Sequence, residues 1–154
     1  MQLSSILKPE AVKVFAAASS KKRLFREIGE VAQSAYGLDP QETVDALMER
    51  ESLGPTGVGH GVALPHAHLP ELDRVVGVFV MLERPIDFGA VDRQPVDIAF
   101  SLLAPHDAGV EHLKALALVS RTLRDVSLCS KLRANPDPTK LFALLSQAQP
   151  AQMA

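Results

Sequence analysis

One stretch of the chain places a histidine directly after a proline and downstream of a cluster of glycines. Residues 54–69 read GPTGVGHGVALPHAHL, in which the proline is Pro65 and the histidine is His66. Proline fixes its own φ and forces the preceding residue toward extended geometry, so the pattern predicts a strand end that presents the His66 ring from a rigid corner. A neutral imidazole is a good nucleophile near pH 7, because its unperturbed pKa is about 6.5. We therefore expect phosphoryl transfer onto His66, with a labile P–N bond.

Other residues supply the groups that such chemistry needs around a phosphate. Glycines at Gly57, Gly59 and Gly61 predict a loop whose free backbone amides bind an anion. Arg50, at the expected end of a helix, offers a planar guanidinium suited to phosphate oxygens. His112, in the first turns of another expected helix, offers a second imidazole N–H beside a favourable helix dipole. Taken singly, each residue is more often structural or exposed, so the hypothesis depends on their combination.

A metal site is an alternative use of the same histidines. His60, His66 and His68 lie within nine positions, and in an extended segment His66 and His68 share a face. No cysteine accompanies them, no two histidines have the His-x-x-x-His spacing of a helical pair, and carboxylates near the cluster are sparse. Phosphoryl transfer without a metal is therefore favoured over a histidine-cluster metal-binding module.

Composition narrows the class of protein. The chain has 154 residues, a net charge of −2 and no tryptophan, which argues against a nucleic-acid partner. Its single cysteine, Cys129, excludes an internal disulfide and suits a reducing compartment. No apolar run approaches the roughly 18 residues of a membrane span, and the N-terminus resembles no signal peptide. We expect a cytoplasmic protein, with residues 1–150 as one domain and residues 151–154 as a frayed tail.

Helices are expected wherever a capping residue precedes an apolar stripe. Gly37 is expected to stop the first long helix, and Pro40 and Glu42 strengthen the start of the second as its N1 and N3 residues. The expected caps, in chain order, are Ser19 or Ser20, Asp39, Asp107, Asp125 and Asp137.

Two apolar runs are expected to form central strands. Residues 74–82, closed by the Glu83-Arg84-Pro85 segment, and residues 96–103 are apolar on both faces. Near the N-terminus, Pro9 is expected to separate a helical turn from a short strand or turn over residues 12–15. Strands that are apolar on both faces are covered on both sides, so the pattern predicts a mixed sheet between two layers of helices.

The glycine stretch also resembles a known family. Residues 50–66, RESLGPTGVGHGVALPH, resemble the signature of the phosphotransferase-system IIA domains of the fructose/mannitol type. The resemblance continues through residues 76–80, 83–88, 94–97 and the helix that begins near His112, and it covers nearly the whole chain. Within that family the chain is most similar to the stand-alone nitrogen-regulatory branch.

This resemblance implies a three-layer α/β/α fold with a mixed sheet and a phosphotransferase relay without metal or organic cofactor. It implies that His66 accepts a phosphoryl group through Nε2 from an HPr-like phosphocarrier, that His112 hydrogen-bonds the phosphohistidine and that Arg50 helps to hold the phosphate. The implied output is control of proteins such as potassium-transport regulators and sensor kinases. A sugar-specific component that passes phosphate to a IIB domain is the alternative. His60 and His68 depart from the family pattern, standing where asparagine and lysine or arginine are common.

Overall fold

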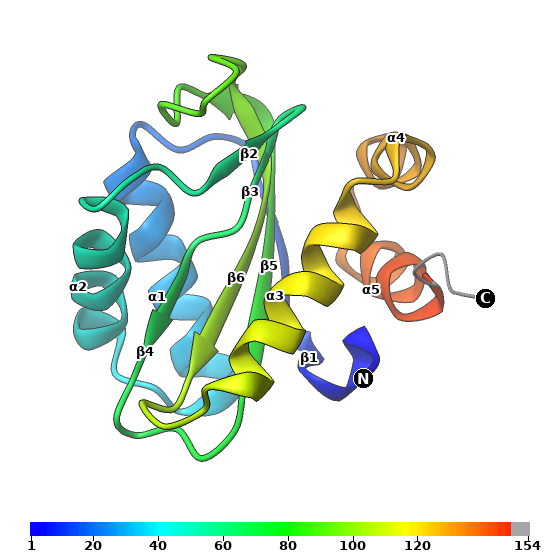
Figure 1. Ribbon diagram of the computed structural model, residues 1–154. Coiled ribbons are helices and arrows are strands. Elements are labelled where there is room, and N and C mark those ends of the chain that lie inside the picture. The colour runs from blue at the N-terminus through cyan, green and yellow to red at the C-terminus, as the bar shows by residue number, and fades with distance from the viewer. Residues whose placement is uncertain (149–154) are drawn as a thin grey trace.

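The computed structural model describes residues 1–148, so the tail expected at residues 151–154 lies outside the described residues. Within that range the chain forms one six-stranded sheet with helices on both of its faces (Figure 1). The strands are β1 (Leu7–Phe15), β2 (Gly57–Gly59), β3 (Val62–Ala63), β4 (His66–His68), β5 (Val76–Ile86) and β6 (Val96–Ala104). The helices are a short 3-10 helix (Leu3–Ser5), α1 (Lys21–Tyr36), α2 (Pro40–Glu51), α3 (Val110–Leu123), α4 (Val126–Ala134) and α5 (Pro138–Gln147).

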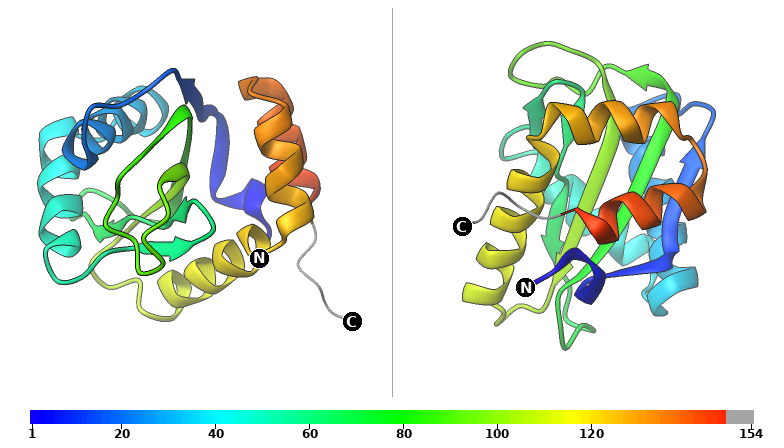
Figure 2. Two further views of the ribbon diagram at one scale, coloured as in Figure 1. Left: turned by 90° about the horizontal axis from the view of Figure 1, so that it is seen from above. Right: turned by 90° about the vertical axis from the view of Figure 1, so that its right-hand side faces the viewer.

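The expected three-layer α/β/α architecture with a mixed sheet is confirmed. The strand order is β1-β5-β6-β3-β2, and β4 pairs with β6 beyond the end of β3. β5 is parallel to β1 but antiparallel to β6, whereas β3 and β4 are parallel to β6. Helices α1 and α2 cover one face, and α3, α4 and α5 cover the other (Figures 1 and 2).

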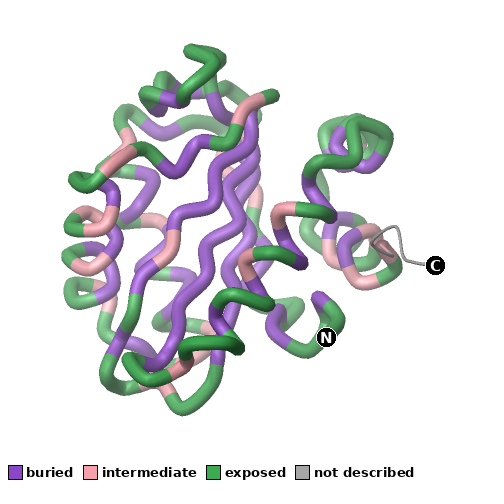
Figure 3. Tube along the Cα trace, in the orientation of Figure 1, coloured by how far each residue is buried: buried purple, intermediate pink, exposed green. Residues whose placement is uncertain are grey.

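The core lies along the two central strands, as their two-sided apolar pattern predicts. Phe79 and Phe100 are fully buried, stand opposite each other in the β5–β6 register and meet edge to face with ring centroids 6.0 Å apart. Figure 3 shows the central strands as the most continuously buried part of the chain. Burial on both faces makes these strands the rigid support on which β3 and β4 are carried.

Most of the expected helix ends are confirmed. The Ser20 hydroxyl accepts a hydrogen bond from the Arg23 amide, and the Asp39 carboxylate accepts one from the Glu42 amide. Asp125 and Asp137 cap α4 and α5 in the same way, and Gly37 ends α1 in the left-handed conformation. The expected cap at Asp107 is wrong, because α3 begins at Val110 after Gly109 without a side-chain cap.

Two prolines were expected to end elements, and both instead lie within strands. Pro9 lies inside β1, which is an edge strand with an irregular register between Leu7 and Val12. Pro85 is exposed inside β5, where the pairing with β6 is interrupted between Met81 and Ile86. Edge strands and bulges tolerate proline because they do not require its missing N–H.

Candidate functional site

His66 begins a short strand of its own. β3 ends at Ala63, and β4 resumes the pairing with β6 at His66, opposite Leu102. Between them the Pro65 carbonyl accepts a hydrogen bond from the Leu102 amide at 2.9 Å. The sequence predicted a strand end before His66, and the structure corrects this to a break at Leu64 and Pro65, because proline has no N–H to offer the sheet.

The hydrogen bonding of His66 defines which of its ring nitrogens carries the hydrogen. Its Nδ1 lies 2.8 Å from the Leu64 carbonyl oxygen, and a carbonyl only accepts, so Nδ1 carries the hydrogen. Nε2 therefore holds a free lone pair in the neutral ring. Burial lowers the pKa of His66 below its ordinary value, and the Arg50 charge lowers it further, although the bond to Leu64 opposes them. The half-buried ring is thus neutral and nucleophilic near pH 7.

His112 lies beside this ring, in the first turn of α3. Its ring centroid is 5.6 Å from that of His66, with an interplanar angle of 70°. His112 is buried, and its Nε2 has no hydrogen-bond partner within residues 1–148. Burial, together with the neighbouring His68 and His66, lowers the pKa of His112 to about 4. The ring is therefore neutral near pH 7 and has one nitrogen without a protein partner.

Arg50 is brought to the same place from the opposite side. It lies in the last turn of α2, which packs against β4, and its Nη1 donates to the Gly54 carbonyl at 3.0 Å. Its charge is close enough to act on the pKa of His66. The structure thus places His112 beside His66 and the Arg50 charge near enough to affect His66, and all three residues were singled out in the sequence.

Glu51 anchors the segment that follows Arg50, a role that the sequence did not predict. Its buried carboxylate accepts hydrogen bonds from Lys21 Nζ at 2.9 Å, from the Thr56 amide at 3.0 Å and from the Thr56 hydroxyl at 2.7 Å. A negative charge at the C-terminal end of a helix opposes the helix dipole. That unfavourable position was the signal in the sequence that Glu51 has partners elsewhere.

The glycines form a hairpin rather than an open loop. Gly57 and Gly59 belong to β2, which pairs with β3, and the turn between them contains Gly61. Gly61 lies beside Asp97 of β6, whereas His66 pairs five positions further along that strand, which corresponds to roughly 16 Å. Figure 1 shows the hairpin turn at the upper end of the sheet and β4 toward the lower end. The structure therefore does not bring Gly59 and Gly61 to the His66 ring.

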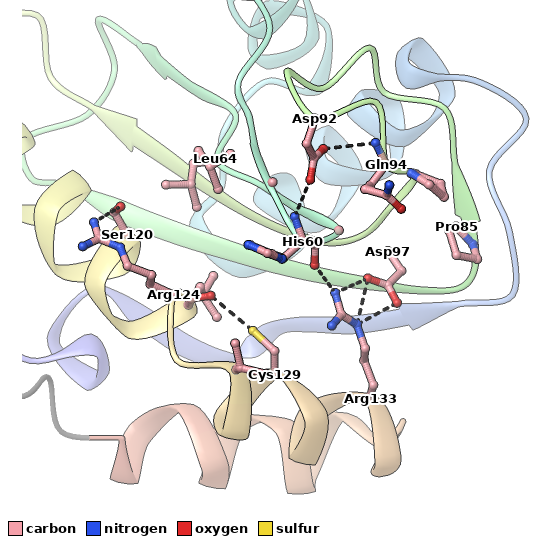
Figure 4. A pocket seen from close by; sticks show the side chains of 16 residues that line it. His60, Leu64, Pro85, Asp92, Gln94, Asp97, Ser120, Arg124, Cys129 and Arg133 are labelled. Atoms are coloured by element: carbon pink, nitrogen blue, oxygen red, sulfur yellow. Dashed lines mark hydrogen bonds and ion pairs between the residues drawn. The ribbon is translucent and has the colours of Figure 1, made fainter.

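A cavity of about 750 Å³ lies between the hairpin and helices α3 and α4 (Figure 4). His60 and Arg133 line it, and His66 does not. The Arg133 guanidinium is held by Asp97, with N–O distances of 2.8 and 2.9 Å, and by the His60 carbonyl at 2.8 Å. Its charge is therefore already paired within the protein.

The alternative metal site used His60 together with His66 and His68. His60 lies in the hairpin turn with a positive φ of 58°, while His66 and His68 belong to β4. In the part of the chain that the structure describes, no three histidine, cysteine, aspartate or glutamate residues are grouped so as to hold a metal ion.

The sequence is similar to known proteins over nearly its whole length. Residues 5–148 match the family described as phosphoenolpyruvate-dependent sugar phosphotransferase system, EIIA 2. The nitrogen regulatory protein of Bradyrhizobium diazoefficiens is 42% identical over 146 residues, which cover 95% of this chain and 95% of that protein. None of the helices within residues 1–148 has the length and apolar character needed to cross a membrane.

Solved structures share the fold. The nitrogen regulatory protein IIA-Ntr from Neisseria meningitidis has a TM-score of 0.85 and 32% identity, over 92% of this chain and 97% of that one. Mannitol enzyme IIA from Escherichia coli, solved in complex with phosphorylated mannitol enzyme IIB, has a TM-score of 0.71 and 23% identity, over 91% of this chain and 98% of that one.

Proposed function

The chain belongs to the phosphoenolpyruvate-dependent sugar phosphotransferase system EIIA 2 family, and we propose that it is a phosphoryl-carrier regulatory protein of the nitrogen-type branch. Family membership implies a component of a phosphotransferase relay. The acceptor in this proposal is Nε2 of His66. The observation that carries it is the hydrogen bond from His66 Nδ1 to the Leu64 carbonyl, which leaves Nε2 with its lone pair on a neutral ring.

The transfer moves one phosphoryl group between two imidazoles. The lone pair of His66 Nε2 forms a bond to phosphorus while the P–N bond of the donor phosphohistidine breaks and returns its electron pair to the donor ring. His66 keeps its Nδ1 hydrogen, so its ring becomes cationic after the transfer. The hydrogen bond to the Leu64 carbonyl then becomes charge-assisted and stabilises the product.

The protein's remaining task is to hold the phosphoryl oxygens in line and to stabilise their charge. Arg50 uses one N–H group to bind Gly54, which leaves other N–H groups of its planar fork for the phosphoryl oxygens. The unpartnered Nε2 of His112 provides a second donor when it carries a hydrogen. In this proposal the glycines have a structural role, because they form the hairpin that supports β3 and the Leu64–His66 corner.

The proposed donor is an HPr-like phosphocarrier, and the proposed output is regulation of partners such as potassium-transport regulators or sensor kinases, in the cytoplasm. Leu53, Val110 and Leu113 are exposed apolar residues on the segments that carry Arg50 and His112, and they give a protein partner a surface to contact. Phosphorylation adds a charge of about −1.5 to −2 beside them. A partner that contacts these residues therefore meets a different electrostatic surface in each state.

The test is to incubate the protein with phosphoenolpyruvate, enzyme I and an HPr-type carrier. We expect one phosphoryl group per chain, labile in acid and stable in alkali, and absent from His66→Ala. His60→Asn is the matched control, because it also removes one imidazole but tolerates the positive φ of the hairpin turn. An acid-stable adduct, or one that persists in His66→Ala, contradicts the proposal.

A sugar-specific component is the second candidate, because the mannitol enzyme IIA with the same fold was solved with a phosphorylated IIB partner. Such a component passes its phosphoryl group rapidly to a sugar-linked IIB domain, whereas a regulator keeps it until a partner responds. Mixing the phosphorylated protein with purified fructose- and mannitol-type IIB domains separates the two. We expect no fast transfer, and transfer within the mixing time supports the sugar-specific alternative.

A further inference from the structure

His112 lies beside His66 and is also within hydrogen-bond distance of a third histidine, His68. The Nδ1 of His112 lies 3.1 Å from the Nε2 of His68, which is a hydrogen-bond distance, so one of these two nitrogens carries a hydrogen and the other accepts it. Because the His112 ring is neutral near pH 7, it has a single hydrogen, either on Nδ1 or on Nε2. The direction of the bond to His68 decides between them.

That choice determines what His112 does for the phosphoryl group. Its Nε2 is buried and has no partner among residues 1–148, and its ring lies 5.6 Å from that of His66. Phosphoryl oxygens accept hydrogen bonds, so Nε2 stabilises them only when it carries the hydrogen. If the hydrogen sits on Nδ1 instead, Nε2 presents a lone pair to negatively charged oxygens, and the contact is repulsive.

We propose that His68 is a positioning residue that selects the tautomer of His112: its Nε2–H donates to His112 Nδ1 and keeps the hydrogen of His112 on Nε2, available to the phosphoryl group. The inference rests on the proposed function, because it assigns a role relative to phosphorylated His66.

The strand and a stacked ring hold His68 where this role requires it. His68 follows His66 by two positions in β4, so both side chains project from the same face of the strand. His68 pairs with Ala104, and the next amide, of Leu69, donates to the Ala104 carbonyl at 2.8 Å. The His106 ring stacks on His68 at a centroid distance of 6.0 Å and an interplanar angle of 15°. These contacts restrict the orientation of the His68 ring toward His112.

The tautomer itself is measurable in the unphosphorylated protein, from long-range ¹H–¹⁵N spectra of the labelled histidine rings. We expect the hydrogen of His112 on Nε2 in the wild type and in His68→Lys, whose ammonium group only donates. We expect it on Nδ1 in His68→Glu, whose carboxylate only accepts. His60→Asn is the control and should leave the tautomer unchanged. A wild-type hydrogen on Nδ1, or the same tautomer in the lysine and glutamate variants, overturns the proposal.

The consequence for transfer is measured with phosphoramidate as the donor, because this small molecule needs no protein docking surface. It loses its P–N bond to His66 Nε2 and leaves as ammonia. Loss of the partner that orients a metal-ligating histidine costs on the order of 10- to 100-fold, and we expect a similar range for His112. We expect that slowing in His68→Leu, and a rate within a few-fold of wild type in His68→Lys.

A double-mutant cycle separates action through His112 from any direct effect of residue 68. In a His112→Ala background, His68→Leu should slow phosphorylation no further, because the ring that it orients is gone. A full additional loss in that background overturns the proposal. If the wild type accepts no phosphoryl group at all, the proposed function fails, whereas the tautomer spectra still decide the role of His68.

Discussion

The Nδ1 nitrogen of His66 lies 2.8 Å from the carbonyl oxygen of Leu64, only two residues earlier in the chain. Pro65 separates the two residues and restricts Leu64 to extended geometry. The contact is therefore local, and three consecutive residues determine which ring nitrogen keeps a free lone pair. In the proposed function, other parts of the fold supply the groups that meet the phosphoryl group on the other side of the ring.

The first prediction follows from this contact. Phosphorylation should place the phosphoryl group on Nε2 of His66 and not on Nδ1, because Nδ1 is occupied by its hydrogen bond to Leu64. Ring ¹⁵N spectra of the phosphorylated protein identify the substituted nitrogen. Free histidine treated with the same phosphoramidate serves as the control for intrinsic preference. A phosphoryl group on Nδ1 contradicts the mechanism.

The second prediction concerns stability and pH. His112 has a pKa of about 4 in the folded protein and about 6.5 when unfolded, so between these values the unfolded chain binds the extra proton. The contribution of the neutral ring is fully present above pH 6.5 and is lost as the pH falls toward 4. We expect His112 to account for a fall of about 2–3 kcal/mol in the free energy of unfolding across this window.

Denaturant unfolding of wild type and His112→Gln from pH 7 to pH 4 provides the measurement. Glutamine cannot take up a proton, so the variant should lose less stability over this range than the wild type does. Carboxylates titrate equally in both proteins, and the difference between the two curves isolates the histidine. Parallel curves mean that His112 does not titrate with the lowered pKa.

Much of the fold could be predicted because its signals are local. Asp39, Asp125 and Asp137 cap helices through hydrogen bonds to amides two or three residues away, which the sequence pattern contains. Asp107 has the same residue type before an apolar stripe, yet α3 begins at Val110 without it. Pro9 was expected to separate two elements, but it lies inside β1. Only the order of strands in the sheet shows that β1 is an edge strand, which tolerates proline.

The candidate site likewise has some features that the sequence predicts locally and others that depend on the tertiary fold. Residue chemistry pointed to His66, Arg50 and His112, and the structure places His112 beside His66 with the Arg50 charge near enough to affect it. The hydrogen bond between His68 and His112 joins residues 44 positions apart, and no local pattern contains it. The glycine spacing was compatible with either an anion loop or a hairpin, and only the pairing of β2 with β3 decides the conformation.

The third prediction is that Glu51→Ala lowers the free energy of unfolding by about 3 kcal/mol, because it leaves Lys21 and the Thr56 amide without their buried carboxylate. Glu49→Ala is the matched control, since Glu49 is an exposed acidic residue two positions earlier in the same helix. Its effect should stay within about 0.5 kcal/mol. Denaturant unfolding measures both, and equal effects for the two variants exclude the anchoring role of Glu51.

The fourth prediction tests what the hairpin glycines do. Gly61 has a φ of +81°, and a Cβ there would lie 2.6 Å from Nη2 of Arg133 and 3.1 Å from the Asp97 carboxylate. Gly61→Ala should therefore cost about 2 kcal/mol or more in the free energy of unfolding, from backbone strain and displacement of the Arg133–Asp97 pair. Gly37→Ala is the matched control, because its φ of +73° brings the strain but its Cβ meets no atom within 4 Å.

The difference between the two losses of unfolding free energy measures the clash of the new Cβ with Arg133. Equal losses for Gly61→Ala and Gly37→Ala mean that the Arg133–Asp97 pair moves aside at no cost in stability.

The Gly61→Ala variant also separates a hairpin role from direct phosphate binding. Because Gly61 lies roughly 16 Å along the sheet from His66, folded Gly61→Ala should accept a phosphoryl group from phosphoramidate within a few-fold of the wild-type rate. A loss on the order of 100-fold, the cost of removing one donor to a developing negative charge, would instead place the hairpin amides against the phosphate.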